Sequence, residues 1–341
     1  MSKHKKHRSE DLQKFDPKNI KILYGIPHCH TNISTGKCSA LEALEYAKKN
    51  RLDFLIITDH NRYFSSNSHK EHNSKWDELK RTLDRFNKKN EDFVGIVGFE
   101  ASSNPWGHLN IVNSSSCFSG VIRNFNNLML WMIANGNSYI SINHPGSIVE
   151  QIPFSPFLNK FINTIEVGNG SYPNKYHRYS KRYFSMLDKG WMLGAVNAQD
   201  NHQLNFGDTE NLTGVLVNKL DKTSIISSLR NRRCFSSESR TLKFYFTINS
   251  SFMGEELITE KNNKLHFYIH AEDRVNIIEE VQIITSGGRI LKTLKEISLH
   301  NLKYSISFPA SERERWYVIK LIQKNNREAI SSPIFIKIKN S

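Results

Sequence analysis

Short apolar runs alternate with helix-like stretches through the first two thirds of this 341-residue chain. Several of these runs contain few polar residues, which is typical of strands buried on both faces of a sheet. The predicted strands are Lys21–Tyr24, Phe54–Thr58, Val94–Phe99, Leu109–Val112, Tyr139–Ile142, Thr164–Val167 and Met192–Val196. This order of strands and helices predicts an α/β unit with a parallel sheet, either open or closed into a barrel.

Helical patterns separate several of these strands. Ser39 and Glu42 have the spacing of a capping box, and the segment ALEALEYAKKN that follows Ser39 places apolar residues at helical intervals. Residues 74–90, 121–135 and 174–189 carry similar patterns. We therefore expect four helices in this part of the chain.

The sequence pattern changes after about residue 240. Short runs such as TLKFYFTIN and KLHFYIHA replace the helical stretches, and several of them alternate apolar and polar residues. This alternation predicts antiparallel strands with one buried face. We expect three parts: a basic, flexible tail at 1–20, an α/β unit at 21–240 and a small antiparallel β-sandwich at 241–341.

The composition narrows the class of protein and of ligand. The formal net charge is +14, which favours anionic ligands such as phosphate esters and is compatible with nucleic acid. No apolar run approaches the roughly 18 residues of a membrane span, and the basic N-terminus lacks the apolar segment of a secretory signal. Four scattered cysteines without a CxxC pair predict a cytoplasmic protein without disulfides.

Histidines and carboxylates recur where the predicted strands end. In chain order they are His28, His30, Asp59, His60, Glu100, His108, His144, Glu166, Asp200 and His202. Most of them lie at or just after the carboxyl end of a strand, and this is the edge at which parallel βα folds gather their active sites. We therefore expect these side chains to converge in space.

Metal binding explains the residue types in this set. Imidazole and carboxylate together bind Zn, Mn or Fe. His28 and His30 are two residues apart in an extended segment and point to the same side, so the Cys29 thiol points the other way. Glu100 is suited to bridge two cations. About eight ligands are too many for one tetrahedral ion and suit two or three ions.

The same residues resemble the motifs of a known family. The segment HCHTNISTGKCSALEALEYAKKNRLDFLIITDHN resembles the opening of the PHP (polymerase and histidinol phosphatase) metal-dependent hydrolases. The later GFE, GH, NHPG and DNH match that family's successive motifs in the same order, from about residue 21 to 240. The segments IEVGNG and LTGVLVNKLDKTSIISSLRNRRCFSS, with a β domain behind them, resemble the CehA/McbA branch.

The resemblance implies a distorted (βα)7 barrel with a metal cluster at its mouth. By position, His28, His30, Glu100 and Asp200 would hold one ion; Glu100, His108 and His144 would hold a second; and His60 and His202 would hold a third. One departure weakens the third site. Thr35 stands where the family often has an aspartate, and a neutral hydroxyl is a poorer ligand for a hard cation. The resemblance therefore implies two ions, with a third site in doubt.

The predicted activity is hydrolysis by a metal-bridged hydroxide, and a phosphomonoester or phosphodiester is the preferred substrate. Asp200 would orient the nucleophile, and His202 or His60 would protonate the leaving oxygen. The predicted anion contacts are Arg62, His177 and Arg178. Glu166 either orients the substrate or hydrogen-bonds behind the ligands.

Two other functions fit the same motifs. The first is hydrolysis of a carboxylic ester or carbamate on the same metals, which a pocket lined by residues such as Phe64, Trp106 and Tyr172 would favour. The second is a metal-stabilised scaffold without catalysis, which binds a partner through the β domain. A nuclease is a variant of the phosphoesterase and would bind nucleic acid with a steep dependence on salt.

Overall fold

The computed structural model describes residues 16–64 and 75–339. Residues 1–15 of the predicted tail and the first residue of the predicted helix 74–90 lie outside this range. The last residues of the predicted flexible tail are held in place, because Asn218 donates from Nδ2 to the carbonyls of Asp16 and Asn19 at 2.8 and 2.9 Å. No helix in the described part of the chain has the length and apolar character to cross a membrane.

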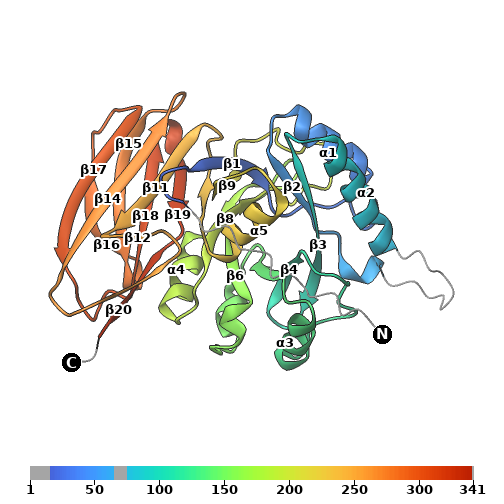
Figure 1. Cartoon of the computed structure of the whole chain (residues 1–341), viewed down its shortest axis with the longest axis horizontal. Helices are drawn as coiled ribbons and strands as arrows, with labels where there is room; N and C mark the ends of the chain where they lie inside the picture. The colour runs from blue at the N-terminus through green and yellow to red at the C-terminus, as the bar shows by residue number, and fades with distance from the viewer. Residues whose placement is uncertain (1–15, 65–74, 340–341) are drawn as a thin grey trace, which may run out of the picture.

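A single large sheet runs through both halves of the protein (Figure 1). In its N-terminal half the strands lie in the order β10-β9-β1-β2-β3-β4-β5-β6, and β6 also pairs with β8 and with the short β7. Their bounds are β1 Lys21–Ile26, β2 Phe54–Ile57, β3 Val94–Ser103, β4 Gly107–Val112, β5 Tyr139–Ile142, β6 Ile162–Asn169, β7 His177–Arg178, β8 Gly194–Ala198, β9 Leu212–Val217 and β10 Cys234–Ser237. All seven strands that the apolar runs predicted are present.

The sheet is mixed, so the prediction of a parallel sheet was only partly right. The pairs β1–β2, β2–β3, β5–β6 and β6–β8 are parallel, whereas β4 is antiparallel to both β3 and β5. Only residues 104–106 connect β3 to β4. A parallel pair needs a crossover of a dozen or more residues, so this short link enforces an antiparallel hairpin.

The row of strands curves so that β8 approaches β9 and β10. Asn197 of β8 donates from its backbone nitrogen to Thr213 Oγ1 at 2.8 Å, and that hydroxyl donates to the carbonyl of Asn197. The Asn197 side chain also donates to the carbonyl of Ser237 at 3.0 Å. Side chains therefore link the two ends of this row.

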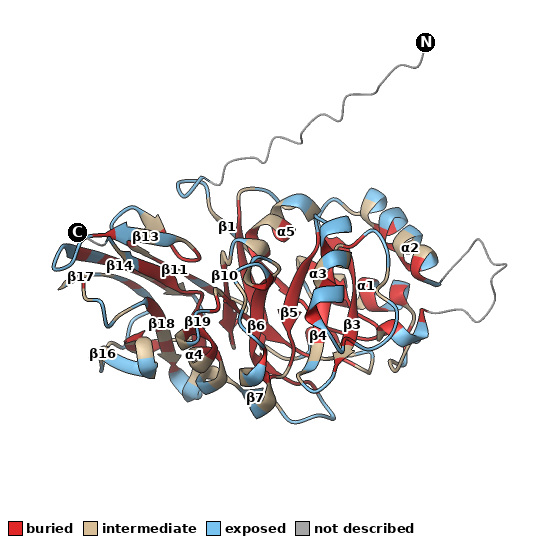
Figure 2. Ribbon diagram, turned by 90° about the horizontal axis from the view of Figure 1, so that it is seen from below, coloured by how far each residue is buried: buried red, intermediate tan, exposed pale blue. Residues whose placement is uncertain are grey.

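Helices pack against the strands as apolar periodicity requires. They are α1 Ala40–Lys49, α2 Lys75–Lys89, α3 Phe125–Ala134, α4 Ser180–Asp188 and α5 Lys222–Arg230. The capping box at α1 is confirmed, because Ser39 Oγ accepts from Glu42 N and the Glu42 carboxylate accepts from Ser39 N. In Figure 2, α2 and α3 expose one face while the strands behind them are buried.

One predicted helix is shorter than its pattern indicated. The segment 174–189 is helical only from Ser180, and its first half contains the strand β7, which pairs with the end of β6. The element α5 was not among the predicted helices. It begins at Lys222, and the side chain of the preceding Asp221 accepts from Ser224 N at 2.7 Å as an N-cap.

The C-terminal third consists of strands and short turns. A four-stranded antiparallel sheet has the order β12-β11-β14-β17, and the other strands extend the large sheet. The bounds are β11 Leu242–Ile248, β12 Ser251–Phe252, β13 Glu256–Thr259, β14 Lys264–Asp273, β15 Ile278–Thr285, β16 Arg289–Leu294, β17 Asn301–Pro309, β18 Trp316–Gln323, β19 Arg327–Ser331 and β20 Ile334–Ile338. Because β19 pairs antiparallel with β10, backbone hydrogen bonds join the two halves.

Candidate metal centre

Six histidines and two carboxylates from distant parts of the chain meet at one edge of the N-terminal strands. His28 and His30 follow β1, His60 follows β2, His144 follows β5, and Asp200 and His202 follow β8. His108 lies near the start of β4, which is antiparallel and so begins at the same edge. Glu100 lies within β3 and not at its end, because β3 continues to Ser103.

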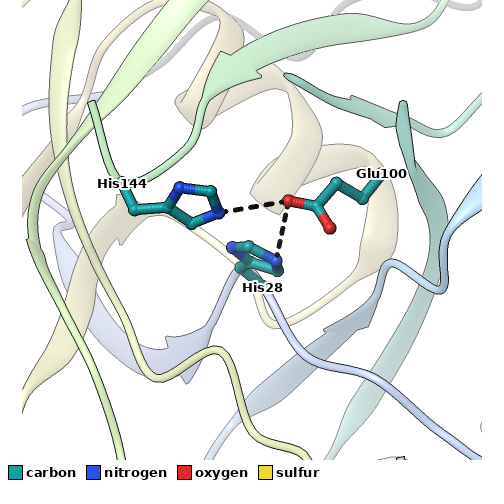
Figure 3. Close-up of side chains that lie close together, drawn as sticks. All are labelled: His28, Glu100 and His144. Atoms are coloured by element: carbon teal, nitrogen blue, oxygen red, sulfur yellow. Dashed lines mark ion pairs between the residues drawn. The ribbon is translucent and has the colours of Figure 1, made fainter. Parts of the chain in front are cut away.

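Glu100 is at the centre of this cluster. Figure 3 shows its Oε1 between His28 and His144, with Nε2 of the two histidines 3.4 and 3.3 Å away. Nδ1 of His108 lies 3.1 Å from the same oxygen, and Nδ1 of His60 lies 2.9 Å from Oε2. The Glu100 side chain is 1% exposed, so both of its oxygens face inward.

His28 and His30 share a second carboxylate. Nε2 of His28 and Nε2 of His30 lie 3.3 and 3.1 Å from Oδ1 of Asp200, and the two nitrogens are 3.2 Å apart. The Cys29 thiol between them donates instead to the carbonyl of Ile56, on the other side of the strand. The extended backbone therefore presents both imidazoles to the same point.

Three groups of side chains bring ligand atoms within 4.8 Å of one another in the described residues. They are His28 with Glu100 and His144, His28 with His30 and Asp200, and His30 with His60 and Glu100. His28, His30 and Glu100 each belong to two groups. An arrangement in which ligands are shared is suited to ions that lie close together.

His202 borders the cluster without entering a group. Its ring centroid lies 4.4 Å from that of His30, and its Nδ1 is 2.9 Å from the backbone carbonyl of Asp200. An acceptor at that distance favours the tautomer with the proton on Nδ1. Nε2 of His202 then carries the lone pair.

Asp59 was predicted as a metal ligand, and the structure gives its carboxylate another set of partners. Oδ1 accepts from the backbone nitrogens of Thr31 and Ser34 at 2.8 and 3.2 Å and from the Ser34 hydroxyl, and Oδ2 accepts from the Thr31 hydroxyl. Asp59 is in none of the three groups. It holds the turn that follows His30, since four hydrogen bonds occupy its two oxygens.

Glu166 is buried beside His28 and His144, in a position that fits the second of its two predicted roles, hydrogen bonding behind the ligands. Its Oε1 lies 2.7 Å from Nδ1 of His28, and its Oε2 accepts from His144 N and from Asn169 Nδ2. The side chain is 1% exposed and neither oxygen is without a partner. Because Nδ1 of His28 faces a carboxylate, it carries the proton and leaves the Nε2 lone pair directed into the cluster.

Two residues of the cluster have an unusual backbone. His144 and Asp200 have φ values of 24° and 50°, in the left-handed region that residues other than glycine rarely adopt. Hydrogen bonds hold both residues, from His144 N to Glu166 and from Asp200 N to the carbonyl of His28. Strain of this kind gathers at functional sites, where the surrounding structure imposes it.

Burial and charge act against each other at these residues. Burial lowers the pKa of His28, but Asp200, Glu100 and Glu166 together raise it well above its ordinary value. Burial raises the pKa of Asp200, but His28 and His30 hold it well below the usual range. Carboxylates that stay ionised in a buried site are suited to bind a cation.

The donor set fits divalent metal ions. In the part of the chain that the structure describes, Asp200 Oδ1 is a buried oxygen with no hydrogen-bond donor, yet two imidazole nitrogens lie within 3.3 Å of it. An orphaned acceptor beside nitrogen lone pairs is accounted for by a cation that all of them bind. Imidazole with carboxylate is the ligand combination of Zn, Mn and Fe sites.

Thr35 remains a weak candidate for the third site. Its hydroxyl is buried, and no hydrogen-bond partner is present among the described residues. It belongs to none of the three groups. The turn that contains it closes tightly, because Gly36 N donates to the carbonyl of Thr31 at 2.8 Å.

Arg178, one of the predicted anion contacts, forms ion pairs with carboxylates of the protein itself. Its Nε and Nη2 donate to the Glu238 carboxylate at 2.7 and 2.6 Å, Nη1 donates to Glu328 at 3.1 Å, and Nη2 also donates to the carbonyl of Asn326. These bonds join β7 to the turns near β10 and β19. These donors hold the two halves of the protein together, and the contact of Arg178 with an anion stays a prediction.

The other two predicted anion contacts are exposed. Arg62 follows His60 in the short helix η1 (Asn61–Tyr63), and its guanidinium lies 5.0 Å from the centroid of the Tyr63 ring. His177 lies on β7. Among the described residues no carboxylate lies within 4.0 Å of Arg62, so its charge is available to a ligand.

The aromatic residues that would favour an apolar substrate do not form a common pocket wall. Phe64 is 6% exposed and packs edge-on against Trp76, in the core beside α2. Trp106 packs against Phe125 and donates from Nε1 to the carbonyl of Gln151. Tyr172 is 81% exposed.

Two asparagines near the cluster were not predicted. Asn143 donates from Nδ2 to Glu100 Oε1 at 2.9 Å, and Asn169 donates to Glu166 Oε2 at 2.6 Å. Both stand inside motifs that the sequence analysis quoted, NHPG and IEVGNG. Their amides orient the carboxylates of Glu100 and Glu166. This role became visible only from the contacts in the folded chain.

Comparisons with known proteins give relatives of limited similarity. No family model matches the chain. An uncharacterized protein of Chlamydia pneumoniae is 24% identical over 140 residues, which are 37% of this chain and 23% of the relative. An uncharacterized protein of Chlamydia muridarum is 23% identical over 171 residues, 44% of this chain and 27% of the relative. The chain thus spans about a quarter of the length of the curated relatives it matches.

A solved structure is similar over almost the whole chain. It is a two-domain protein from Bacteroides vulgatus that contains a predicted PHP-like metal-dependent phosphoesterase. The match has a TM-score of 0.50 at 17% identity and covers 90% of this chain and 91% of that one. At this identity the likeness shows a shared fold, and it extends through both halves of the molecule.

Proposed function

We propose that this chain is a metal-dependent hydrolase of the PHP superfamily, resembling the CehA/McbA branch, and that it hydrolyses phosphomonoesters or phosphodiesters. The observation that carries the proposal is the convergence of two imidazole nitrogens on the unpartnered Asp200 Oδ1, next to the buried Glu100 carboxylate. The fold shared with a protein that contains a predicted PHP-like phosphoesterase agrees with it.

The proposal assigns the ligands to two ions, Mn, Zn or Fe, that share residues. His28, His30 and Asp200 would hold one ion, and His108 and His144 would hold the other, with Glu100 between them. His60 and His202 would complete a third site if Thr35 permits one. When bound, such ions supply Lewis acidity and lower the pKa of water toward neutrality.

The residues of the chain would do the remaining work. Glu166 orients His28, and Asn143 orients Glu100, so that the ligand atoms are fixed before binding. Asp200 would orient the attacking water. His202 would hold or deliver a proton from Nε2, because its Nδ1 is already bonded to the carbonyl of Asp200.

A phosphoester is the favoured substrate because of the charge near the cluster. Arg62 lies two residues after the proposed ligand His60 and has no carboxylate partner in the described chain. A guanidinium fork matches phosphate oxygens, and the net charge of +14 attracts anions. An apolar ester or carbamate has less support, since Phe64 belongs to the core.

The same proposal covers organisation and location. Residues 21–240 would form a distorted (βα)7 barrel with the cluster at its mouth, and residues 241–341 would form an appended β-sandwich. We also propose a cytoplasmic location, since Cys29, Cys38, Cys117 and Cys234 are all free thiols.

The test is metal-restored hydrolysis. The purified chain is stripped with a chelator, supplied with Mn, Zn or Fe(II), and offered a chromogenic phosphomonoester, phosphodiester, carboxylic ester and aryl carbamate. His30→Ala removes a proposed ligand. His266→Ala is the matched control, because that exposed histidine lies on β14 and bonds Ser307 of β17, within the C-terminal sheet.

We expect the protein to turn over the phosphate substrates only when metal is supplied. This turnover should survive in His266→Ala and be lost in His30→Ala. Turnover confined to the ester or carbamate would refute the proposed substrate class and leave the metal centre standing. Activity of His30→Ala in metal-depleted buffer would refute the metal mechanism. Metal binding without turnover of any substrate would favour a metal-stabilised scaffold.

A further inference from the structure

A cavity lies at the opposite end of the strands from the metal cluster. Its volume is about 780 Å³, which is within the range of small-molecule sites. Asn137, Lys160 and Met192 line it, and each lies two positions before the start of its strand, β5, β6 and β8 respectively. The cluster residues follow the carboxyl ends of those parallel strands, so the cavity is separate from the metal centre.

The helix α5 forms one wall of this cavity. Residues from both of its ends line the cavity, from Lys222 to Arg230, and α5 packs against β9 and β6 (Figure 1). The base of the cavity lies close to β6, where Asn163 is the second residue. Glu166 is three positions after Asn163, or about 10 Å along an extended strand.

The charge of the lining is entirely positive. Lys160, Lys222, Arg230 and Arg232 contribute, and no aspartate or glutamate lines the cavity. Among the described residues no carboxylate oxygen lies within 4.0 Å of any of these four cations. Burial lowers the pKa of Lys222, Asp84 opposes the shift, and Lys80 adds to it. An anion in the cavity would relieve this unbalanced charge.

Arg232 is held in place by the protein. Its Nε donates to the carbonyl of Gly254 at 2.9 Å, and its guanidinium lies 6.0 Å from the centroid of the Phe335 ring. These contacts come from the C-terminal third of the chain. A pre-positioned guanidinium loses little freedom when it binds an anion, which favours a built site over a chance gathering of cations.

Amides form most of the remaining polar lining. Five asparagines line the cavity, together with the hydroxyls of Thr223 and Ser227. Asn163 is 5% exposed, and its Nδ2 donates to the carbonyl of Lys160 at 3.3 Å. That bond identifies Nδ2 as the atom that faces the Lys160 carbonyl and fixes the orientation of the amide. The amide oxygen Oδ1 has no hydrogen-bond donor among the described residues. A buried acceptor beside a cavity is accounted for by a ligand that donates to it.

We propose that this cavity binds a small phosphorylated polyol or sugar, with the phosphate on the cations and the hydroxyl groups on the amides. Amides both donate to and accept from hydroxyl groups, as a polyol requires. No aromatic side chain lines the cavity, so it offers no stacking surface for a nucleotide base. The site is independent of the hydrolytic function proposed above.

The experiment is calorimetric titration of the full-length chain, with metal and after chelation. One probe is the non-hydrolysable methylene phosphonate analogue of glucose 6-phosphate, and the other is inorganic phosphate. Binding at the metal centre disappears with the metal, whereas binding in the α5 cavity persists. The variants are the double substitution Lys222→Ala with Arg230→Ala, and Asn163→Leu.

The matched control is Lys21→Ala with Arg51→Ala, which removes the same charge from a different cavity beside β1. We expect the Lys222 and Arg230 pair to weaken binding of the analogue at least about tenfold, and the control pair to leave it within about twofold. Circular dichroism and the urea midpoint establish that each variant is folded.

Four results would overturn the proposal. They are no saturable binding after chelation, an unchanged affinity in the Lys222 and Arg230 variant, an equal loss in the control pair, and inorganic phosphate binding as tightly as the analogue. The last result would leave an anion site without recognition of hydroxyl groups. Asn163→Leu should weaken the analogue but not inorganic phosphate, because its free oxygen serves the polyol.

Discussion

Oε1 of Glu166 lies 2.7 Å from Nδ1 of His28, and this contact fixes the imidazole that two groups of the metal cluster share. The carboxylate is 1% exposed and its other oxygen is bonded to His144 N and Asn169. Glu166 contacts Nδ1 of His28 and not Nε2, the atom that would bind a metal ion. It thus determines which nitrogen of His28 is free to bind one.

Replacing Glu166 with glutamine should weaken metal binding. Glu166→Gln keeps the shape but removes the charge that holds the proton on Nδ1 of His28, so we expect metal affinity to fall about 10–100-fold. Competition with a chromophoric chelator measures this. Glu312→Gln is the control, because Glu312 is exposed and pairs with Lys261, away from the cluster. Equal affinities in wild type and Glu166→Gln would contradict the orienting role.

Gly36 should tolerate no side chain. A Cβ at this position would lie 2.4 Å from the carbonyl oxygen of His30, so the turn that follows this ligand would have to move. We expect Gly36→Ala to lower the free energy of unfolding by about 1–3 kcal/mol and to reduce metal affinity. Gly146→Ala is the control, since nothing lies within 4 Å of its added Cβ. Urea unfolding measures the free energy of unfolding of both variants. Equal values for Gly36→Ala and Gly146→Ala would mean that the turn after His30 has room for a side chain.

Metal removal should lower the thermal midpoint. Ions that bind only the folded chain at 100 times their Kd contribute about 2.7 kcal/mol, which corresponds to a midpoint shift of roughly 4–6 °C for a protein of this size. Asp200→Ala removes the shared Oδ1 and should lose this metal-dependent shift. A differential scan with and without chelator measures it. A shift of the same size in Asp200→Ala would remove this residue from the ligand set.

The two arginines that were predicted as anion contacts should separate binding from stability. Arg178→Gln breaks the pair with Glu238 and the contact to Glu328, and we expect a loss of about 1–2 kcal/mol with an unchanged KM for a chromogenic phosphoester. Arg62→Gln should raise KM several-fold at unchanged stability. The reverse pattern would mean that Arg178 binds substrate after all.

Acid should destabilise the junction between the two halves through Asp273. Its carboxylate accepts from Ser239 Oγ and Thr241 Oγ1, in the link between β10 and β11, and from Gln323 Nε2 of β18, at 2.6 to 2.8 Å. Burial raises the pKa of Asp273, but these hydrogen bonds outweigh it and lower the pKa to about 2.

The sign of the effect follows from that lowered pKa. Stability from Asp273 is fully present above the unfolded value near 4, and it is lost as the pH falls toward 2. We expect about 2 kcal/mol to disappear in that window. Urea unfolding between pH 7 and 2 should show it in wild type, and Asp273→Asn should be less stable at pH 7 with a smaller acid dependence. Identical pH profiles would assign no linkage to this carboxyl.

Local sequence determined much of the fold. Apolar runs predicted the seven strands because burial on both faces excludes polar residues, and the Ser39–Glu42 capping box predicted the start of α1. The direction of β4 and the strand β7 within a helical pattern depended on chain links and on pairing with β6. The apolar periodicity of a strand carries no information about which other strand pairs with it.

The site divides in the same way. The sequence by itself indicated that a set of histidines and carboxylates would converge, because their types suit metal binding and most of them follow the predicted strands. The assignment of His28, His30, Glu100 and Asp200 to one ion came from the resemblance to a known family. Only the tertiary structure decided that Glu166 faces His28 and that Arg178 holds Glu238. Residue type sets what a side chain can bind, but its partner is chosen by packing between segments that lie far apart in the chain.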